Sequence, residues 1–306
     1  MISASGVRIG WADLPARVRD AVQTTLGSPV VQAKSQAGGF SPGTADRVVT
    51  EAGDRAFVKA VGRTLNAQSV KMARAELHIT AALPATAPAP RLLGSYDDGD
   101  WVALILEDID GRHPRTPWVA GEIDATVTAL RELAATLTPS PVPDAPRAAG
   151  LLGHDFGGWD RLAADRPADL DPWAAEHLDE LRARAASGLA AVAAGDTLTH
   201  CDIRADNLLV RPDGRIVIVD WPWGSIGPAW LDTVLLAVNV IVHGGDAGRV
   251  LSGVEPRHAI DVIAGFTGYF LYQCRQPDPP GLPTVRAFQR AQGDALLPWL
   301  RARHPR

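Results

Sequence analysis

The chain has 306 residues, of which 46% are hydrophobic and 21% charged, a balance typical of a soluble globular protein. This length exceeds one ordinary hydrophobic core and favours two lobes or domains. The formal net charge of −5 argues against a nucleic-acid partner, because proteins that bind nucleic acid usually present a basic face. A negative surface instead suits the attraction of cationic molecules.

Cysteine content and hydropathy bear on the cellular compartment. Two cysteines, Cys201 and Cys274, are too few for a disulfide framework, and the first residues show no apolar segment typical of a signal peptide. The longest apolar run, around residues 234–242, is too short to span a bilayer. We therefore expect a cytoplasmic protein with no membrane partner, either a monomer or a homodimer.

The first third of the chain combines strand signals with two helices. An amphipathic pattern predicts a helix at 15–26, which Gly27-Ser28-Pro29 ends, and a second helix at 66–82. Turn residues at 53–54 and 97–99 predict hairpins. The expected strands are 30–36, 47–51, 56–61, 91–96 and 101–106.

Helical patterns dominate from about residue 110, with one hairpin around Pro212-Asp213-Gly214. The expected helices are 120–137, 174–194, 231–242, 257–275 and 285–303. This order predicts an α+β fold of two lobes. A small antiparallel β-sheet lobe with one packed helix would span residues 1–108, and a larger, mainly α-helical lobe would span residues 109–306.

A polar loop at residues 197–207 carries the strongest chemical signal. It presents Asp202 and, five positions later, Asn207, and Asp220 follows at the end of the apolar strand 216–219. Packing explains a carboxylate at the end of a buried strand poorly. Asn207 and Asp220 together suit a hard cation such as Mg²⁺, completed by phosphate oxygens. Asp202 then remains free to align or deprotonate a substrate hydroxyl.

The small lobe offers a matching cation. The chain has three lysines, and Lys59 lies inside the apolar strand 56–61, where its charge needs a partner or a ligand. Glu76 on the following helix is a fitting partner, and a nucleotide phosphate is a fitting ligand. The turn at residues 38–43, Gly-Gly-Phe-Ser-Pro-Gly, would bring backbone N–H groups close to phosphate oxygens.

Together the H-x-D-x-x-x-x-N segment at 200–207, Lys59 and the D-W pair at 220–221 resemble the aminoglycoside phosphotransferase family, which has a protein-kinase-like fold. The resemblance implies ATP or GTP as co-substrate with Mg²⁺ as cofactor. It makes Asp202 the catalytic aspartate, braced by His200, and makes Asn207 and Asp220 the metal ligands.

The resemblance also implies a nucleotide site. Lys59 would hold the α- and β-phosphates with Glu76 behind it, and Ser41 lies in the turn that would cover the phosphates. The connector Glu107-Asp108-Ile109 would meet the base through its backbone. Asp232, at the start of a later helix, is expected to be structural, capping that helix or bracing the loop.

Two residues inside the 200–207 loop depart from the family pattern. The family usually has H-G-D with a histidine at the position of Arg204, whereas this chain has Cys201 and Arg204. Arg204 occupies the place where protein kinases carry a lysine that touches the transferred phosphate, and a guanidinium can do the same. These departures concern the subfamily, and hence the acceptor, rather than the phosphoryl transfer.

Several other side chains have two readings. Cys201 is either a reactive thiol or, as we favour, a small buried residue. Asp155 and Asp160 either bind an amine-bearing substrate or cap a helix. Five tryptophans either line a substrate pocket or pack in the core. These are Trp159, Trp173, Trp221, Trp223 and Trp230.

The predicted function is transfer of the γ-phosphoryl group to a hydroxyl of a small molecule, an aminoglycoside-type antibiotic or a similar metabolite. One alternative keeps the chemistry and changes the acceptor to a sugar, a choline-like alcohol, a hydroxyl amino acid or another antibiotic. A second is a nucleotide-binding regulatory protein without transfer activity. A protein kinase is disfavoured, because the sequence has no D-F-G, no A-P-E and no evident activation loop.

Overall fold

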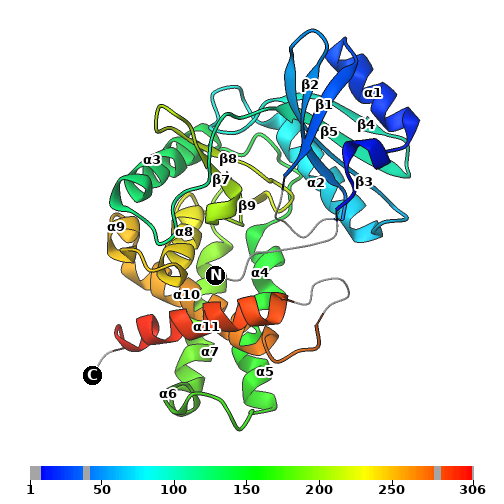
Figure 1. Cartoon of the computed structure of the whole chain (residues 1–306). Helices are drawn as coiled ribbons and strands as arrows, with labels where there is room; N and C mark the ends of the chain where they lie inside the picture. Colours follow the sequence, from blue (N-terminus) through cyan, green and yellow to red (C-terminus); the bar gives the residue numbers. More distant parts are fainter. Residues whose placement is uncertain (1–7, 37–41, 279–283, 305–306) are drawn as a thin grey trace.

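The computed structural model describes residues 8–36, 42–278 and 284–304. Ser41 and most of the glycine-rich turn at 38–43 lie outside the described residues. Figure 1 shows a sheet-containing part, formed by the first third of the chain, beside a larger helical part. The predicted α+β class, with an antiparallel N-terminal sheet followed by a mainly helical part, is confirmed.

The sheet has five antiparallel strands in the order β1-β2-β3-β5-β4. The strands are β1 Val30–Ser35, β2 Thr44–Thr50, β3 Arg55–Gly62, β4 Leu92–Asp97 and β5 Trp101–Glu107. β3 is the central strand, and β5, between β3 and β4, is buried along nearly its whole length through its apolar run WVALIL. The register places Lys59 of β3 between Ala45 of β2 and Leu104 of β5.

One helix covers each face of this sheet (Figure 1). Val18 and Val22 of α1, Ala16–Leu26, are fully buried in clusters with sheet residues such as Val58 and Ala103. Val70 of α2, Ala67–Ala82, packs against Val61 and neighbours on the opposite face. Asn66 caps α2 by accepting a hydrogen bond from the backbone N of Ser69 at 2.9 Å. This packing sets the orientation of α2, whose Glu76 side chain points toward Lys59.

The helical part is organised around the long helix α10, which packs against α7, α11, α5 and α4 (Figure 1). Its helices are α3 Ala120–Thr136, α4 Ala148–Phe156, α5 Gly158–Ala164, α6 Pro172–Glu176, α7 Leu178–Val192, α8 Leu231–Val242, α9 Ala247–Leu251, α10 Pro256–Gln273 and α11 Val285–Arg301. Glycines stand where helices cross most closely: Gly188 of α7 lies against the backbone of Asp261, and Gly158 against Gly268.

Two short ladders shape the loops that carry the predicted chemistry. β6 Thr197–Thr199 pairs with β9 Ser225–Gly227, and β7 Leu208–Val210 pairs with β8 Ile216–Ile218. The 3₁₀ turn η2, Ala205–Asn207, leads directly into β7. Residues 200–204 and 219–224 are therefore held between strands at both ends. The sequence predicts the second ladder, a local hairpin, but not the first, whose two strands are separated in the sequence by the whole β7–β8 hairpin.

The structure corrects three expectations about helices. The predicted helix at 174–194 is two helices, α6 and α7, which meet at His177. The sequence analysis misses α4 and α5 because four glycines within residues 150–158 obscure the helical pattern. The helix-cap reading of Asp155 and Asp160 is wrong, because Asp155 lies in the last turn of α4 and Asp160 in the first turn of α5.

The model also bears on membrane insertion. Within residues 8–36, 42–278 and 284–304, no helix combines the length and the apolar character needed to cross a bilayer. The most apolar helix, α8, is instead buried among the other helices, with Leu231, Leu236 and Val240 fully inaccessible.

Candidate active site

The backbone of the loop after β6 is held by one carboxylate. Asp232, in the first turn of α8, accepts hydrogen bonds from the backbone N of His200 at 2.7 Å and of Cys201 at 3.0 Å. Cys201 has a φ of 63°, a left-handed conformation that is costly for a residue with a side chain. The two bonds to Asp232 stabilise that turn. Asp232 thus braces the loop, which is one of the two structural roles expected for it.

His200 connects this loop to the segment that follows β8. Its Nδ1 accepts a hydrogen bond from the backbone N of Asp202 at 3.2 Å, and its Nε2 lies 3.0 Å from the carbonyl oxygen of Val219. These partners assign the proton to Nε2, which donates to Val219. Complete burial lowers the pKa of His200 to about 4, so the ring is neutral near pH 7. His200 therefore orients Asp202 without adding charge.

Asp202 is held by Asn207. The Nδ2 of Asn207 donates to the backbone oxygen of Asp202 at 2.9 Å and to its Oδ2 at 3.0 Å. Burial raises the pKa of Asp202 to about 6; Arg204 and Asn207 oppose this shift, whereas the charges of Asp220 and Asp206 add to it. The result is a carboxylate with one oxygen restrained and a proton affinity well above that of an ordinary aspartate. Such a group is suited to align a hydroxyl and take up its proton.

Lys59 joins three separate elements. Its Nζ lies 2.7 and 2.6 Å from the two carboxylate oxygens of Glu76 on α2, and 2.5 Å from Oδ1 of Asp220 after β8. Burial disfavours the ammonium charge, but the two carboxylates outweigh this and raise the pKa of Lys59. The ion pair expected between Lys59 and Glu76 is present, and the structure adds Asp220 as a second partner.

Asn207 and Asp220 stand side by side. The backbone N of Val219 donates to the carbonyl oxygen of Asn207 at 2.9 Å, which brings the two loops together, and Asp220 follows with a φ of 70°. The Asn207 amide uses its Nδ2 toward Asp202, so its Oδ1 remains an acceptor. One amide oxygen and one carboxylate fit Mg²⁺, which keeps several waters and phosphate oxygens in its shell.

Arg204 lies next to the catalytic-loop carboxylate. Its Nε and Nη2 donate to Asp206 at 3.0 and 2.9 Å, and its Nη1 is 3.6 Å from Oδ1 of Asp202. Asp206 therefore fixes the guanidinium plane while one edge remains directed at Asp202. This arrangement places a fixed positive group beside the group that would align the acceptor.

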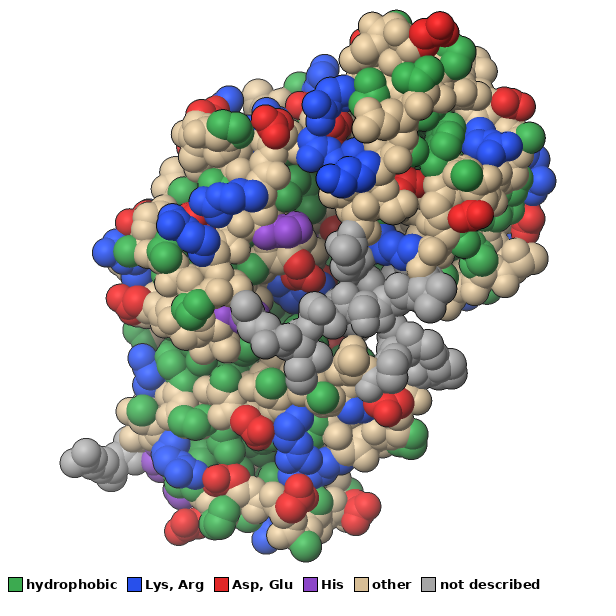
Figure 2. All heavy atoms as spheres, viewed as in Figure 1, with side chains coloured by type: hydrophobic (Ala, Val, Ile, Leu, Met, Phe, Trp, Pro, Cys, Tyr) green, Lys and Arg blue, Asp and Glu red, His purple; other side chains and the backbone are tan. Residues whose placement is uncertain are grey.

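The connector between the sheet and the helical part carries ion pairs that sequence reasoning missed. Asp108 accepts from Arg47 at 2.6 and 3.0 Å and from Arg55 at 2.8 Å, and its side chain is only 3% exposed. Glu107 pairs with Arg91 at 3.3 Å and Arg211 at 3.1 Å. In Figure 2, Lys and Arg side chains gather where the sheet meets the helical part.

Ile109, which follows these carboxylates, is buried. Glu107 is engaged through its side chain, and its backbone N also donates to the carbonyl oxygen of Arg91 at 2.9 Å, so the predicted contact of the connector with a base would fall on its other backbone groups. The arginine partners come from β2, β3, the segment before β4 and the end of β7, so no local pattern indicates them.

Tyr269, on α10 of the helical part, is a polar group whose pKa responds to the charge of Asp202. Burial, reinforced by the charges of Asp155 and Asp202, raises the pKa of Tyr269 to about 12, and Gln289 Nε2 donates to its hydroxyl at 3.5 Å. Within the described part of the chain, the side chain of Asp155 makes no hydrogen bond or ion pair, and burial raises its pKa to about 6. Sequence analysis considered Asp155 but gave no signal for Tyr269 or Gln289, which belong to α10 and α11.

Cys201 and the tryptophans have mainly packing roles. Burial raises the pKa of the Cys201 thiol, which lies 3.1 Å from the hydroxyl of Thr199, so the favoured reading as a small buried residue holds. Trp159 and Trp221 are almost completely buried, and Trp230 stacks on His258. Trp223, three residues after Asp220, is 37% exposed and remains able to contact a ligand.

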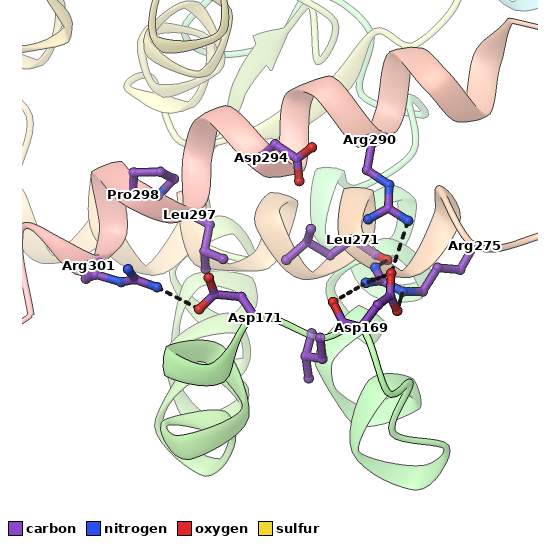
Figure 3. Close-up of a pocket in the computed structure, with 10 residues that line it drawn as sticks. Asp169, Asp171, Leu271, Arg275, Arg290, Asp294, Leu297, Pro298 and Arg301 are labelled. Atoms are coloured by element: carbon purple, nitrogen blue, oxygen red, sulfur yellow. Dashed lines mark hydrogen bonds and ion pairs between the residues drawn. The ribbon is translucent and has the colours of Figure 1, made fainter.

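A cavity of about 300 Å³ lies elsewhere, between the α5–α6 linker and helices α10 and α11 (Figure 3). Its charges neutralise one another: Asp169 pairs with Arg275 at 3.0 Å and Arg290 at 3.5 Å, and Asp171 with Arg301 at 2.6 Å. None of the residues of the Lys59–Asp220 constellation lines it. We therefore assign the chemistry to the constellation around Asp202 and not to this cavity.

The sequence model described as the phosphotransferase enzyme family matches residues 37–259. The match spans well over half of the chain, and the structure supplies the fold and the constellation of that class of enzyme. The protein belongs to the phosphotransferase enzyme family and is in class a small-molecule kinase. The comparison with curated proteins finds no match.

Solved structures confirm the fold. An aminoglycoside phosphotransferase from Alicyclobacillus acidocaldarius aligns with a TM-score of 0.57 and 18% identity, covering 97% of this chain and 99% of that one. A thermostable aminoglycoside phosphotransferase mutant with ADP and hygromycin B aligns with a TM-score of 0.62 and 15% identity, covering 95% of this chain and 100% of that one. A choline kinase from Streptococcus pneumoniae aligns with a TM-score of 0.60 and 13% identity, covering 94% of this chain and 98% of that one. The family resemblance expected from the sequence is thereby confirmed.

Proposed function

We propose that this enzyme transfers the γ-phosphoryl group of ATP or GTP, with Mg²⁺, to a hydroxyl of a small molecule. The observation that carries this proposal is the Lys59 ammonium, bonded to both Glu76 and Asp220 and next to the Asp202–Asn207 pair. The reaction would take place between a nucleotide-binding lobe, residues 1–108, and a helical lobe, residues 109–306, which carries the catalytic loop and the acceptor site.

The nucleotide would bind on the sheet side. Lys59, positioned by Glu76, would contact the phosphates, and the backbone of Glu107 and Ile109 would meet the base. Ser41 is proposed as a phosphate contact on the sequence pattern alone. Asn207 and Asp220 would hold Mg²⁺, which supplies charge neutralisation on the phosphate oxygens when it is bound.

Asp202 would align the acceptor hydroxyl for in-line attack and accept its proton as the new P–O bond forms. The bond from the γ-phosphorus to the bridging oxygen breaks at the same time, and the nucleoside diphosphate leaves. Arg204 would stabilise negative charge on the transferred group. Because this transition state is loose, positioning and electrostatics account for most of the rate.

For the acceptor we propose an aminoglycoside-type antibiotic or a similar hydroxylated metabolite that carries an amine. Asp155, without an ion-pair partner in the described part of the chain and electrostatically coupled to Tyr269 beside Asp202, supports a cationic acceptor. One structural neighbour was crystallised with hygromycin B and another is a choline kinase, so antibiotic resistance and metabolism are both open roles. We place the enzyme in the cytoplasm, where its nucleotide is available.

The decisive test substitutes the catalytic aspartate. We expect Asp202→Ala to lower turnover by roughly 10²-fold or more, the usual contribution of a positioned proton acceptor, while Mg²⁺–nucleotide binding persists. Phosphorylation of a panel of aminoglycosides, choline-like alcohols, sugars and hydroxyl amino acids provides the assay. Asp213→Ala, at an exposed turn of the β7–β8 hairpin, is the matched control.

Two outcomes of this assay would count against transfer. Wild-type turnover in Asp202→Ala would remove Asp202 from the mechanism. Tight nucleotide binding by the unmodified protein, with slow ATP turnover and no acceptor in the panel, would instead support a nucleotide-binding regulatory protein. The complete set of Lys59, Asp202, Asn207 and Asp220 argues against that alternative.

A further inference from the structure

The segment that precedes the first helix lies against the start of β2. The backbone N of Ile9 donates to the carbonyl oxygen of Pro42 at 3.3 Å, and the backbone N of Gly10 donates to Oδ2 of Asp13 at 2.8 Å. These bonds fix the position of Arg8, directly before Ile9. Arg8 lies outside residues 37–259, the part of the chain that matches the family model.

The Arg8 side chain is partly buried and lacks the partners that such a cation normally has. Within the described residues, its Nε is inaccessible to solvent and has no hydrogen-bond partner. Burial lowers the pKa of Arg8, and the negative charges of Asp220 and Asp46 oppose that shift. Buried N–H groups are nearly always hydrogen-bonded, so an unpartnered guanidinium nitrogen requires an explanation. A ligand that binds beside Asp220 would provide one.

The charges around Asp220 show what kind of ligand is required. Lys59 is already engaged by Glu76 and Asp220, and Arg204 is engaged by Asp206. A nucleotide di- or triphosphate brings further negative charge into a region that holds several carboxylates. Arg8 is a cation near this region for which the described structure shows no ion pair within 4 Å.

We propose that Arg8 is a phosphate-binding residue of the nucleotide site, where its guanidinium donates to the phosphate chain next to Lys59. The inference rests on the proposed function, because it needs a nucleotide bound beside Asp220. A guanidinium suits this role because it is always charged and presents two parallel N–H groups to phosphate oxygens. The N-terminal segment then belongs to the nucleotide site and does more than cover the sheet.

An alternative is that Arg8 serves only as a distant counter-charge to the buried Asp46. The two roles differ in what they affect. If the role is structural, Arg8→Ala would lower the thermal stability of the free protein and would reduce the affinity for adenosine and for the adenine nucleotides by the same factor. If Arg8 binds phosphate, the substitution would reduce the affinity only for ligands that carry the phosphate chain.

The experiment measures binding of ATP, ADP, AMP and adenosine, each with Mg²⁺, to the wild type, Arg8→Ala and Arg8→Lys by calorimetry. For Arg8→Ala we expect affinity for ATP and ADP to fall roughly tenfold to a hundredfold, the range for a hydrogen bond to a charged group, with adenosine affinity unchanged. Arg8→Lys should recover part of the loss. Arg19→Ala, which removes a half-buried arginine that donates to the carbonyl oxygen of Ala12, should bind like wild type.

The outcomes separate the two proposals. Wild-type affinity for ATP in Arg8→Ala, or an equal loss for ATP and adenosine, would overturn the role of Arg8 and leave the proposed function standing. Absence of nucleotide binding by the wild-type protein would overturn both. An unchanged melting temperature of free Arg8→Ala, together with a loss confined to ATP and ADP, would establish the phosphate contact.

Discussion

At the scale of single residues, carboxylates from distant elements hold the parts of the site together. Lys59 and the backbone N–H groups of His200 and Cys201 each bind a carboxylate from an element distant in sequence: Glu76, Asp220 or Asp232. Removal of Lys59 would leave the buried Glu76 carboxylate uncompensated, which typically costs about 3–5 kcal/mol. These contacts therefore keep the loops in place before any substrate binds.

Asp155 offers a test by pH at the same scale. Burial raises its pKa in the folded protein to about 6, from an ordinary value of 3.8, and the charges of His154 and Arg161 oppose that shift. Between about pH 4 and pH 6 the folded state therefore holds a proton that the unfolded state has lost. The free energy of unfolding should decrease as the pH rises through this window.

Asp155→Asn removes this titration. We expect the variant to gain stability relative to wild type as the pH rises from 4 to 7, measured by urea unfolding at pH 4, 5, 6 and 7. Asp179→Asn, at an exposed carboxylate on α7, is the control and should follow the wild-type curve. Parallel curves for wild type and Asp155→Asn would contradict the assignment of a raised pKa to Asp155.

At the scale of elements, close helix crossings set the position of α10. Gly188 of α7 faces the backbone of Asp261, where an added Cβ would lie 2.7 Å from the carbonyl carbon and oxygen. Because backbone atoms cannot move aside like a flexible side chain, the two helices would have to separate. The same helix carries Tyr269, so its position affects the surroundings of Asp202.

We predict opposite effects for two Gly→Ala substitutions in helices. Gly188→Ala should destabilise the protein by about 1–3 kcal/mol, the usual cost of overpacking, although alanine favours helix formation. Gly153→Ala in α4, where an added Cβ meets nothing within 4 Å, should stabilise it by up to about 1 kcal/mol. Thermal and urea unfolding of both variants provide the measurement. A stabilising Gly188→Ala would show that α7 and α10 are not held at this distance.

At the scale of the whole molecule, apolar and charged contacts join the sheet part to the helical part, and Ile79 of α2 packs in the core of the helical part. Lys59–Asp220 and Glu107–Arg211 connect the sheet to the loops around β7 and β8. A nucleotide bound between these contacts would touch both parts and so stabilise the entire fold. Ligand binding to the folded state alone contributes about 2.7 kcal/mol at a concentration one hundred times Kd.

The corresponding prediction concerns removal of the metal. ATP with Mg²⁺ should raise the melting temperature of the wild-type protein, and excess EDTA should abolish most of that increase, because Asn207 and Asp220 would no longer share a cation with the phosphates. Differential scanning calorimetry with ATP, ATP–Mg²⁺ and ATP–Mg²⁺–EDTA measures both effects. Equal stabilisation with and without EDTA would count against the proposed metal ligands.

The elements and residues that could be predicted from the sequence are those whose signal lies within a short stretch of the chain. The spacing of His200, Asp202 and Asn207 lies within one loop, and helix α8 follows from an apolar run whose bounds, 231–242, agree with the structure. Lys59 stands out because a cation within an apolar strand needs a partner. In each case the physical requirement, periodicity or burial of charge, is visible within a few neighbouring residues.

What the sequence alone could not determine arises from packing between distant segments. Each of these interactions joins residues more than 40 positions apart: the bond of Lys59 to its second partner Asp220, the bonds of Arg47 and Arg55 to Asp108 and of Arg211 to Glu107, and the electrostatic coupling of Tyr269 to Asp155 and Asp202. Arg8 belongs to the same group. The sequence determined the class of the protein through its local motif, whereas only the tertiary structure decided which charges meet, because helix crossings and strand register set those distances.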